Sequence, residues 1–164
     1  MNAVSTNNET RLRLRMVPPA WLALFAASAY VLNRLLPMPL AWQMFLAQWP
    51  LHEAAVVLWI GAGTLVAWAA GLFLRAGTTI HPHGESDALV VSGPYRFTRN
   101  PMYVAMTAAL TGWALWLATP MALPLIPAFM WVLTRRHIRF EEQRLTERFG
   151  AAYRDYRSQV RRWL

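Results

Sequence analysis

Cysteine and lysine are both missing from this chain of 164 residues. Without cysteine, there are no disulfide bonds and no thiolate ligands for a metal ion. Without lysine, all sixteen basic residues are arginines, and they outnumber the eight acidic residues to give a net charge of +8. In a soluble domain, such an excess would raise the question of nucleic-acid binding. Here the arginines flank long apolar blocks, which favours a lipid bilayer as the partner and argues against nucleic acid.

Charged residues of both signs are scarce, at 15% of the chain against 56% hydrophobic residues. The hydrophobic residues lie in continuous blocks, over about residues 17–36, 54–74, 102–118 and 121–134, rather than at the spacing of an amphipathic surface helix. The first two blocks reach the ~20 residues that cross a ~30 Å hydrocarbon core. The last two are shorter, and only Thr119-Pro120 separates them. We therefore expect an all-α integral membrane protein with about four transmembrane helices, the third and fourth forming a hairpin.

The positions of the arginines predict the orientation of these helices. Fifteen of them lie in the N-terminal arm, in the stretch between the second and third blocks, and in the tail after the fourth. By the positive-inside tendency, both termini and the middle loop are cytoplasmic, at the cell inner membrane if the protein is bacterial. We predict a single domain over residues 1–164. It consists of a basic arm (1–16), transmembrane helices with a cytoplasmic loop (17–136), and a cytoplasmic helical tail (137–164) that breaks near Gly150.

Two polar motifs flank the predicted hairpin. The first is the doubly basic, turn-rich stretch Ser92-Gly-Pro-Tyr-Arg-Phe-Thr-Arg-Asn-Pro-Met-Tyr103, and the second is Phe140-Glu-Glu-Gln-Arg-Leu145. Arginines and carboxylates beside a bilayer are costly to hold, so two such clusters indicate a site. Because the two ends of a hairpin are neighbours, we expect both motifs to line one cytoplasmic pocket that is open to small molecules on one side and to lipid on the other.

In this order and spacing, the motifs resemble those of the isoprenylcysteine carboxyl methyltransferase family and its phospholipid-methyltransferase relatives. The resemblance covers roughly residues 51–164 and also includes Gly77-Thr-Thr-Ile-His-Pro82, Leu89-Val-Val91 and the tail from Arg148 to Trp163. It implies an integral membrane methyltransferase whose two motifs enclose S-adenosylmethionine, with a lipophilic acceptor entering from the membrane. The acceptor would be an isoprenylcysteine-type carboxylate or a related lipid-like substrate. Many members have His where this chain has Asn100, which does not titrate near neutral pH.

The residue types agree with the chemistry of that cofactor. Arg99, helped by Arg96, can pair with its carboxylate in a bidentate way. Glu141 or Glu142 can accept hydrogen bonds from its ammonium or ribose hydroxyls, and the aromatic rings of the motifs can contact its adenine or sulfonium. We predict Arg99 and Glu142 as the catalytic pair, acting mainly by alignment in a water-poor pocket. The set expected to bind the cofactor is His83, Leu89, Val90, Gly93, Tyr95, Arg96, Arg99, Asn100, Pro101, Tyr103, Glu141 and Glu142.

Each motif also has a simpler interpretation. The two arginines can anchor to lipid phosphates, and a Glu-Glu doublet alone is typical of a solvated helix face. His81-Pro-His83 lacks a third ligand at a recognisable spacing, so we predict no metal site. Two other functions stay open on the sequence alone: an NADPH-dependent membrane reductase of the sterol-reductase type, and a non-enzymatic membrane scaffold. The identity of the acceptor and the oligomeric state are also open.

Overall fold

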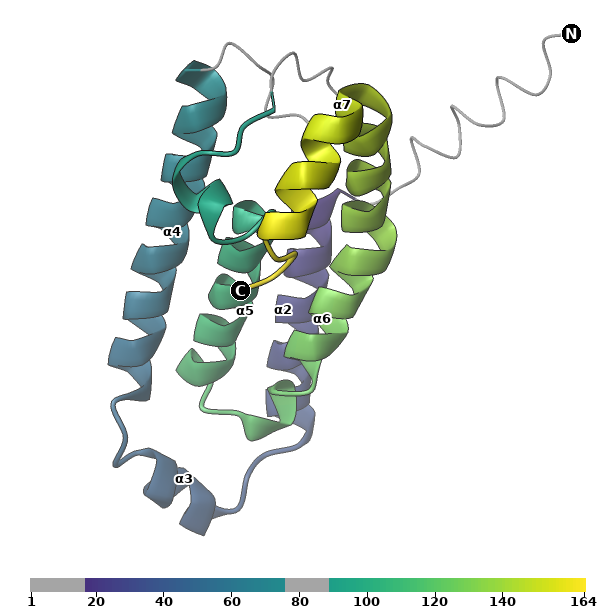
Figure 1. Cartoon of the computed structure of the whole chain (residues 1–164). Coiled ribbons are helices and arrows are strands. Elements are labelled where there is room, and N and C mark those ends of the chain that lie inside the picture. Colours follow the sequence, from purple (N-terminus) through teal and green to yellow (C-terminus); the bar gives the residue numbers. More distant parts are fainter. Residues whose placement is uncertain (1–16, 76–88) are drawn as a thin grey trace, which may run out of the picture.

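Helices account for most of the structure, a computed structural model that describes residues 17–75 and 89–164 (Figure 1). In chain order the α-helices are α2 (Pro18–Leu35), α3 (Leu40–Leu46), α4 (Leu51–Arg75), α5 (Pro101–Trp116), α6 (Leu125–Leu133) and α7 (Arg139–Gln159). Two 3-10 turns, η1 (Gly93–Arg96) and η2 (Pro120–Ala122), and a π-helical turn, η3 (Thr134–Ile138), connect them. The described residues contain no β-strand, which confirms the all-α prediction.

Four of the helices run side by side, with α5 packed against α2, α4 and α6 (Figure 1). The short helix α3 lies at one end of this bundle and α7 at the other. Within the described part of the chain, α4 is the one helix long and apolar enough to cross a membrane. Its large apolar side chains are widely exposed, as lipid contact requires; they include Val57, Ile60, Trp68 and Leu74. The predicted count of four crossings stays a prediction.

Two tryptophans connect the bundle helices by hydrogen bonds. Trp59 Nε1 on α4 donates to the carbonyl oxygen of Ala109 on α5 at 3.1 Å, and Trp113 Nε1 on α5 donates to the carbonyl of Ala26 on α2 at 3.0 Å. An indole N–H away from water needs such an acceptor, so these bonds fix how α2 and α4 sit against α5. Beside them lies an apolar core formed by Tyr103, Leu110, Phe129, Leu133 and Ile138.

Prolines set several helix boundaries. Pro18 and Pro101 lie in the first turns of α2 and α5, where the missing N–H costs nothing. Pro120 opens the short turn between α5 and α6, so the two helices form the predicted hairpin. Helix α3 was not predictable from the sequence, because seven residues are too few to show a helical repeat of hydrophobic residues.

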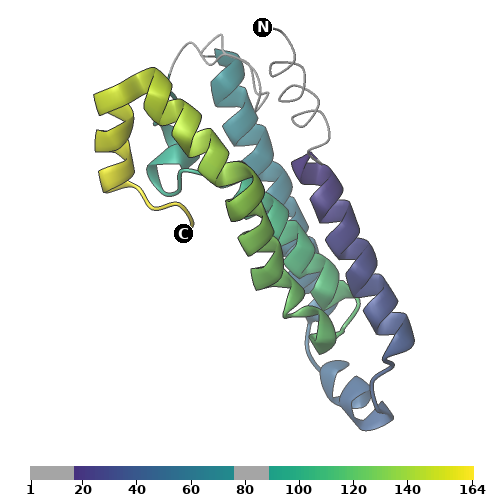
Figure 2. The same ribbon diagram turned by 90° about the vertical axis from the view of Figure 1, so that its right-hand side faces the viewer.

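The chain reverses direction within α7 at Gly150, which confirms the predicted break near this residue. Residues 139–149 continue the line of α6 through the π-helical turn, and the remainder of α7 turns back (Figure 2). Gly150 has φ 52° and ψ −116°, a backbone conformation that L side chains rarely adopt. The reversal carries the last residues of the chain to the loop before α5, where the backbone N–H of Arg99 donates to the carbonyl oxygen of Arg161 at 2.9 Å.

Candidate functional site

The two predicted motifs meet at an ion pair. Arg99 precedes α5, Glu142 lies in the first turn of α7, and Arg99 Nη2 is 3.3 Å from Glu142 Oε1. Both side chains are only 9% exposed. The expectation that the two motifs are neighbours is therefore confirmed, because the hairpin of α5 and α6 brings its two ends together. That they line one pocket stays a prediction.

A second arginine completes this cluster. Arg162 Nε donates to Glu142 Oε1 at 3.0 Å, and Arg162 Nη2 donates to Glu142 Oε2 at 2.7 Å. Burial alone would raise the pKa of Glu142, but the hydrogen bonds from Arg162 and the charges of Arg99, Arg162 and Arg157 together hold that pKa below its usual value. Glu142 is thus an ionised carboxylate whose two oxygens both face guanidinium groups.

The guanidinium of Arg99 keeps hydrogen-bonding capacity that the protein does not use. Its Nε and Nη1 are buried, and neither makes a hydrogen bond of normal geometry among residues 17–75 and 89–164, although the hydroxyl of Tyr153 is close enough for Arg99 to lower the pKa of that group in part. Unsatisfied buried donors on a charged group are costly, so they call for an acceptor. Two arginines also face one carboxylate here, which leaves an excess positive charge. The unused donors and the excess positive charge favour an anionic ligand at this cluster.

The neighbouring carboxyl group has a different environment. Tyr103 Oη on α5 donates a hydrogen bond to Glu141 Oε1. Burial raises the pKa of Glu141, the hydrogen bond from Tyr103 lowers it in part, and the charge of Glu142 raises it again, for a net increase. Adjacent glutamates with pKa values moved in opposite directions are a frequent feature of functional sites.

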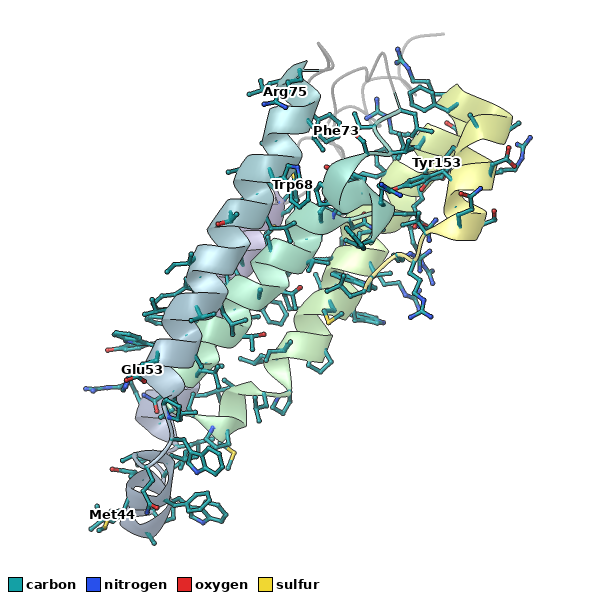
Figure 3. All side chains as sticks on the ribbon, turned by 60° about the vertical axis from the view of Figure 1, so that its left-hand side comes forward. Met44, Glu53, Trp68, Phe73, Arg75 and Tyr153 are labelled. Carbon is teal, nitrogen blue, oxygen red and sulfur yellow. The ribbon has the colours of Figure 1, made fainter. Side chains whose placement is uncertain are left out.

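Helix α4 forms the other wall of the site through the η1 turn. Gly93 has φ +59°, and a Cβ there would lie 2.7 Å from Leu72 Cδ1 and 3.1 Å from Trp68 Nε1, so only glycine fits. The ring of the buried Tyr95 packs edge-on against Phe73 with 5.6 Å between centroids. Figure 3 shows Trp68 and Phe73 near the end of α4 that faces this turn, with Tyr153 of α7 across from them.

The returning half of α7 holds this turn in place. Tyr156 Oη donates to the carbonyl oxygen of Tyr95 at 2.7 Å. Burial raises the pKa of Tyr156 to about 12, with a further contribution from Tyr153, so the hydroxyl stays protonated and available as a donor. Burial also raises the pKa of Tyr95. The first motif is therefore fixed from two sides, by α4 and by α7.

The other predicted residues occupy varied places. Asn100 and Pro101 are buried at the start of α5, and Asn100 Nδ2 donates to the carbonyl oxygen of Arg162 at 2.9 Å. Leu89 and Val90 are half-buried, whereas Arg96 is exposed, so its side chain does not join the buried cluster. His83 lies outside the described residues. What each of these residues binds stays a prediction, and so does the absence of a metal site.

The residues that close the candidate site from the C-terminal side were not predictable from the sequence. We call residues 160–163 the strap. Thr98 Oγ1 donates to the carbonyl oxygen of Arg162 at 3.0 Å, and Trp163 Nε1 donates to Thr134 Oγ1 at 3.3 Å. The tail was recognised as similar to the family, but no local pattern could show that Arg162 pairs with Glu142, because the reversal at Gly150 creates that contact.

A separate cavity of about 610 Å³ lies at the opposite end of the bundle, between α2, α3 and the facing ends of α4 and α5. Its lining includes Arg34, Trp49 and His52 and none of the predicted site residues. The candidate site is the Arg99–Glu142 cluster, because its charged groups are buried and paired and two donors of Arg99 have no hydrogen-bond partner among the described residues.

Fold and site together define a helical protein with a membrane-span candidate and a buried, positively charged polar cluster at one end of its bundle. Residues 51–152 match the phospholipid methyltransferase family, and the chain belongs to this family. Both motifs lie within the match, which confirms the resemblance. The match ends before Tyr153, so the strap lies outside it. The family favours a membrane methyltransferase over the reductase or scaffold alternatives.

Two relatives illustrate the similarity. An uncharacterized protein of Haemophilus influenzae is 38% identical over 63 residues, which are 38% of this chain and the whole of that protein. The protein-S-isoprenylcysteine O-methyltransferase of Saccharomyces cerevisiae is 35% identical over 77 residues, which are 46% of this chain and 32% of the yeast enzyme. The chain therefore covers about a third of the yeast relative's length. No solved structure matches the chain.

Proposed function

We propose that the protein is an integral membrane methyltransferase that uses S-adenosylmethionine to methylate a lipophilic acceptor. The observation that carries this proposal is the buried guanidinium of Arg99, which has two unpartnered donors and lies beside a carboxylate that already faces a second arginine. A carboxylate oxygen is a strong acceptor for either of these charged donors. S-adenosylmethionine carries that group, and membership of a methyltransferase family supports the choice.

The residues around Arg99 suit the remaining parts of the cofactor. Arg99 would donate to the carboxylate through Nε or Nη1, which point to different sides of the guanidinium, while Glu142 fixes the group through Nη2. Glu141 offers an acceptor for an ammonium or a hydroxyl group, and the rings of Tyr95 and Tyr103 offer faces for an adenine or a sulfonium. When bound, the cofactor supplies an electrophilic methyl group. The protein's own contribution is then to orient the reactants and exclude water.

For the acceptor, we propose a carboxylate on a lipid-like molecule. A carboxylate is already nucleophilic at neutral pH, so its methylation requires no general base. An amine acceptor would need a proton removed. Asn100 agrees with this choice, because its side chain donates to the carbonyl oxygen of Arg162 and an amide cannot serve as a base. The name of the yeast relative points to the same class of acceptor.

For the location, we propose an integral membrane protein with its site at the cytoplasmic face. Helix α4 has the length and composition of a membrane span, and Arg75 marks its end on the side of the site. Most arginines of α7 and the strap lie on this side too, as the positive-inside tendency requires. An acceptor held in the bilayer could then reach a site that also opens to the cytosol.

The proposal is tested by thermal-shift measurements on the purified protein in detergent, with S-adenosylhomocysteine and NADPH in parallel. A ligand that binds only the folded state increases the free energy of unfolding by mass action and so raises the melting temperature. The gain is about 2.7 kcal/mol when the ligand concentration is a hundred times the dissociation constant. We expect a rise with S-adenosylhomocysteine and none with NADPH. A rise with NADPH alone would indicate the reductase, and no rise with either would support the scaffold.

A further inference from the structure

The strap places Arg162, which belongs to neither motif, against Glu142. We propose that Arg162 is a positioning residue for the cofactor: it holds Glu142 in place, and Glu142 in turn sets the guanidinium of Arg99 toward the cofactor's carboxylate. This inference rests on the proposed function and adds to it a residue beyond the matched family region. Arg162 itself is not expected to touch the cofactor.

The hydrogen bonds of Glu142 carry the first step. Both carboxylate oxygens accept from Arg162, at 3.0 and 2.7 Å, whereas Arg99 approaches one of them at 3.3 Å. A bidentate pair fixes the plane of the carboxylate as well as its position. The weaker contact to Arg99 then follows the orientation that the stronger pair imposes. Arg99 keeps Nε and Nη1 free because a single carboxylate oxygen takes only its Nη2.

The backbone of the strap carries the second step. The carbonyl oxygen of Arg162 accepts from both Thr98 Oγ1 and Asn100 Nδ2, at 3.0 and 2.9 Å. The carbonyl oxygen of the preceding residue, Arg161, accepts from the N–H of Arg99 at 2.9 Å. The residues on both sides of Arg99 are thus attached to the strap, so the side chain and the backbone of Arg162 act on the same short loop.

Electrostatics give the third step. The charged and titratable groups that face Glu142 are Arg99, Arg157, Arg162, Tyr153 and Glu141. Burial favours the protonated form of Glu142, and the hydrogen bonds from Arg162 are the largest influence that opposes it. Without Arg162, we expect the pKa of Glu142 to rise, so that the carboxylate that orients Arg99 is lost as the pH falls.

The test compares Arg162→Gln with wild type and with Arg154→Gln, which removes the same charge from an exposed position on α7. Binding of S-adenosylhomocysteine is measured by calorimetry in detergent between about pH 5.5 and about pH 8. We expect the affinity of Arg162→Gln to be about tenfold lower at neutral pH, as for loss of a charged hydrogen-bond partner, and to fall further toward acid pH. Wild type and Arg154→Gln should show the same affinity and the same pH profile.

A second measurement does not use the ligand. In the free protein, we expect hydrogen exchange at the amide of Arg99 to be slow in wild type and in Arg154→Gln, and faster in Arg162→Gln. If Arg162→Gln fails to fold, Arg162→Lys replaces it in the test, because lysine keeps the charge but loses the bidentate geometry. We then expect an affinity for S-adenosylhomocysteine below that of wild type but by less than about tenfold, and an affinity equal to wild type would overturn the inference.

The outcomes separate this inference from the proposed function. If wild type does not bind S-adenosylhomocysteine, the proposed function fails, and the role of Arg162 toward the cofactor fails with it. If wild type binds and Arg162→Gln binds equally well at every pH, the proposed function stands and the positioning role of Arg162 is refuted. A loss of affinity without any change in the pH profile would also refute it, since a merely structural defect gives that result.

Discussion

Arg99 and Arg162 share one carboxylate, that of Glu142, although they belong to segments on opposite sides of the α5–α6 hairpin. Arg162 donates two hydrogen bonds to the carboxylate, whereas Arg99 donates at most one and keeps two buried donors without a partner among the described residues. Unsatisfied buried donors are costly, so this asymmetry is expected of a site that binds an anionic ligand.

The first prediction concerns Arg99 and Glu142 themselves. Arg99→Ala should weaken binding of S-adenosylhomocysteine by roughly ten- to a hundredfold, since hydrogen bonds to charged groups contribute about 1.5–3 kcal/mol. Glu142→Gln should weaken it by about tenfold, because the amide no longer fixes the guanidinium. Calorimetry measures both, with Arg139→Ala at an exposed position as the control. Unchanged affinity in both variants would refute the assignment of the site.

The second prediction concerns the opposite pKa shifts of the two glutamates. The pKa of Glu142 is lowered in the folded state, so its stabilising contribution is present above the ordinary pKa of a glutamate and is lost as the pH falls through the lowered value. The pKa of Glu141 is raised, so its burial becomes increasingly unfavourable as the pH rises through and above the ordinary value.

Melting temperatures at about pH 4 and about pH 7.5 test this pair. Glu142→Gln should melt below wild type at the higher pH, with a smaller difference at the lower pH. Glu141→Gln, which still offers an acceptor to Tyr103, should gain relative to wild type at the higher pH. The same pH dependence in both variants would contradict the opposite shifts.

The third prediction concerns the reversal of α7. Gly150→Ala should destabilise the protein by about 1–3 kcal/mol, because an L residue is strained at φ 52° and ψ −116° even though no neighbouring atom obstructs its Cβ. Gly61→Ala is the matched control, since that glycine is helical and its Cβ would also meet open space. It should leave stability unchanged or raise it. Thermal melting in detergent measures both, and equal effects would show that the backbone at Gly150 is unstrained.

The fourth prediction concerns membrane orientation. A reporter active only in the cytoplasm should be active when fused after Leu164, and a reporter active only outside it should be inactive there. The excess of arginine in α7 and the strap gives the reason. Activity of the outside reporter alone at this position would reverse the proposed topology and move the site to the other face.

Much of this arrangement was accessible from sequence, because its signals are local or depend on simple connectivity. The long apolar blocks predicted the bundle helices, Thr119-Pro120 predicted the hairpin turn, and the hairpin predicted that Arg99 and Glu142 are neighbours. Gly150 predicted the break in the tail.

The remainder depends on contacts that no local pattern encodes. The direction in which the tail returns follows from the φ and ψ angles of Gly150, and only that direction brings Arg162 to Glu142. For the same reason, the different roles of the two arginines in the first motif could not be separated by sequence. Arg96 lies on the exposed side of the turn and Arg99 on the buried side.

The return of the chain at Gly150 has a practical consequence for anyone who purifies this protein. Leu164 is exposed and follows Arg162 by only two positions. An affinity tag attached there would therefore disturb the hydrogen bonds between Arg162 and Glu142. Ligand measurements are therefore better made with the tag at the other end of the chain, or after its removal by a protease.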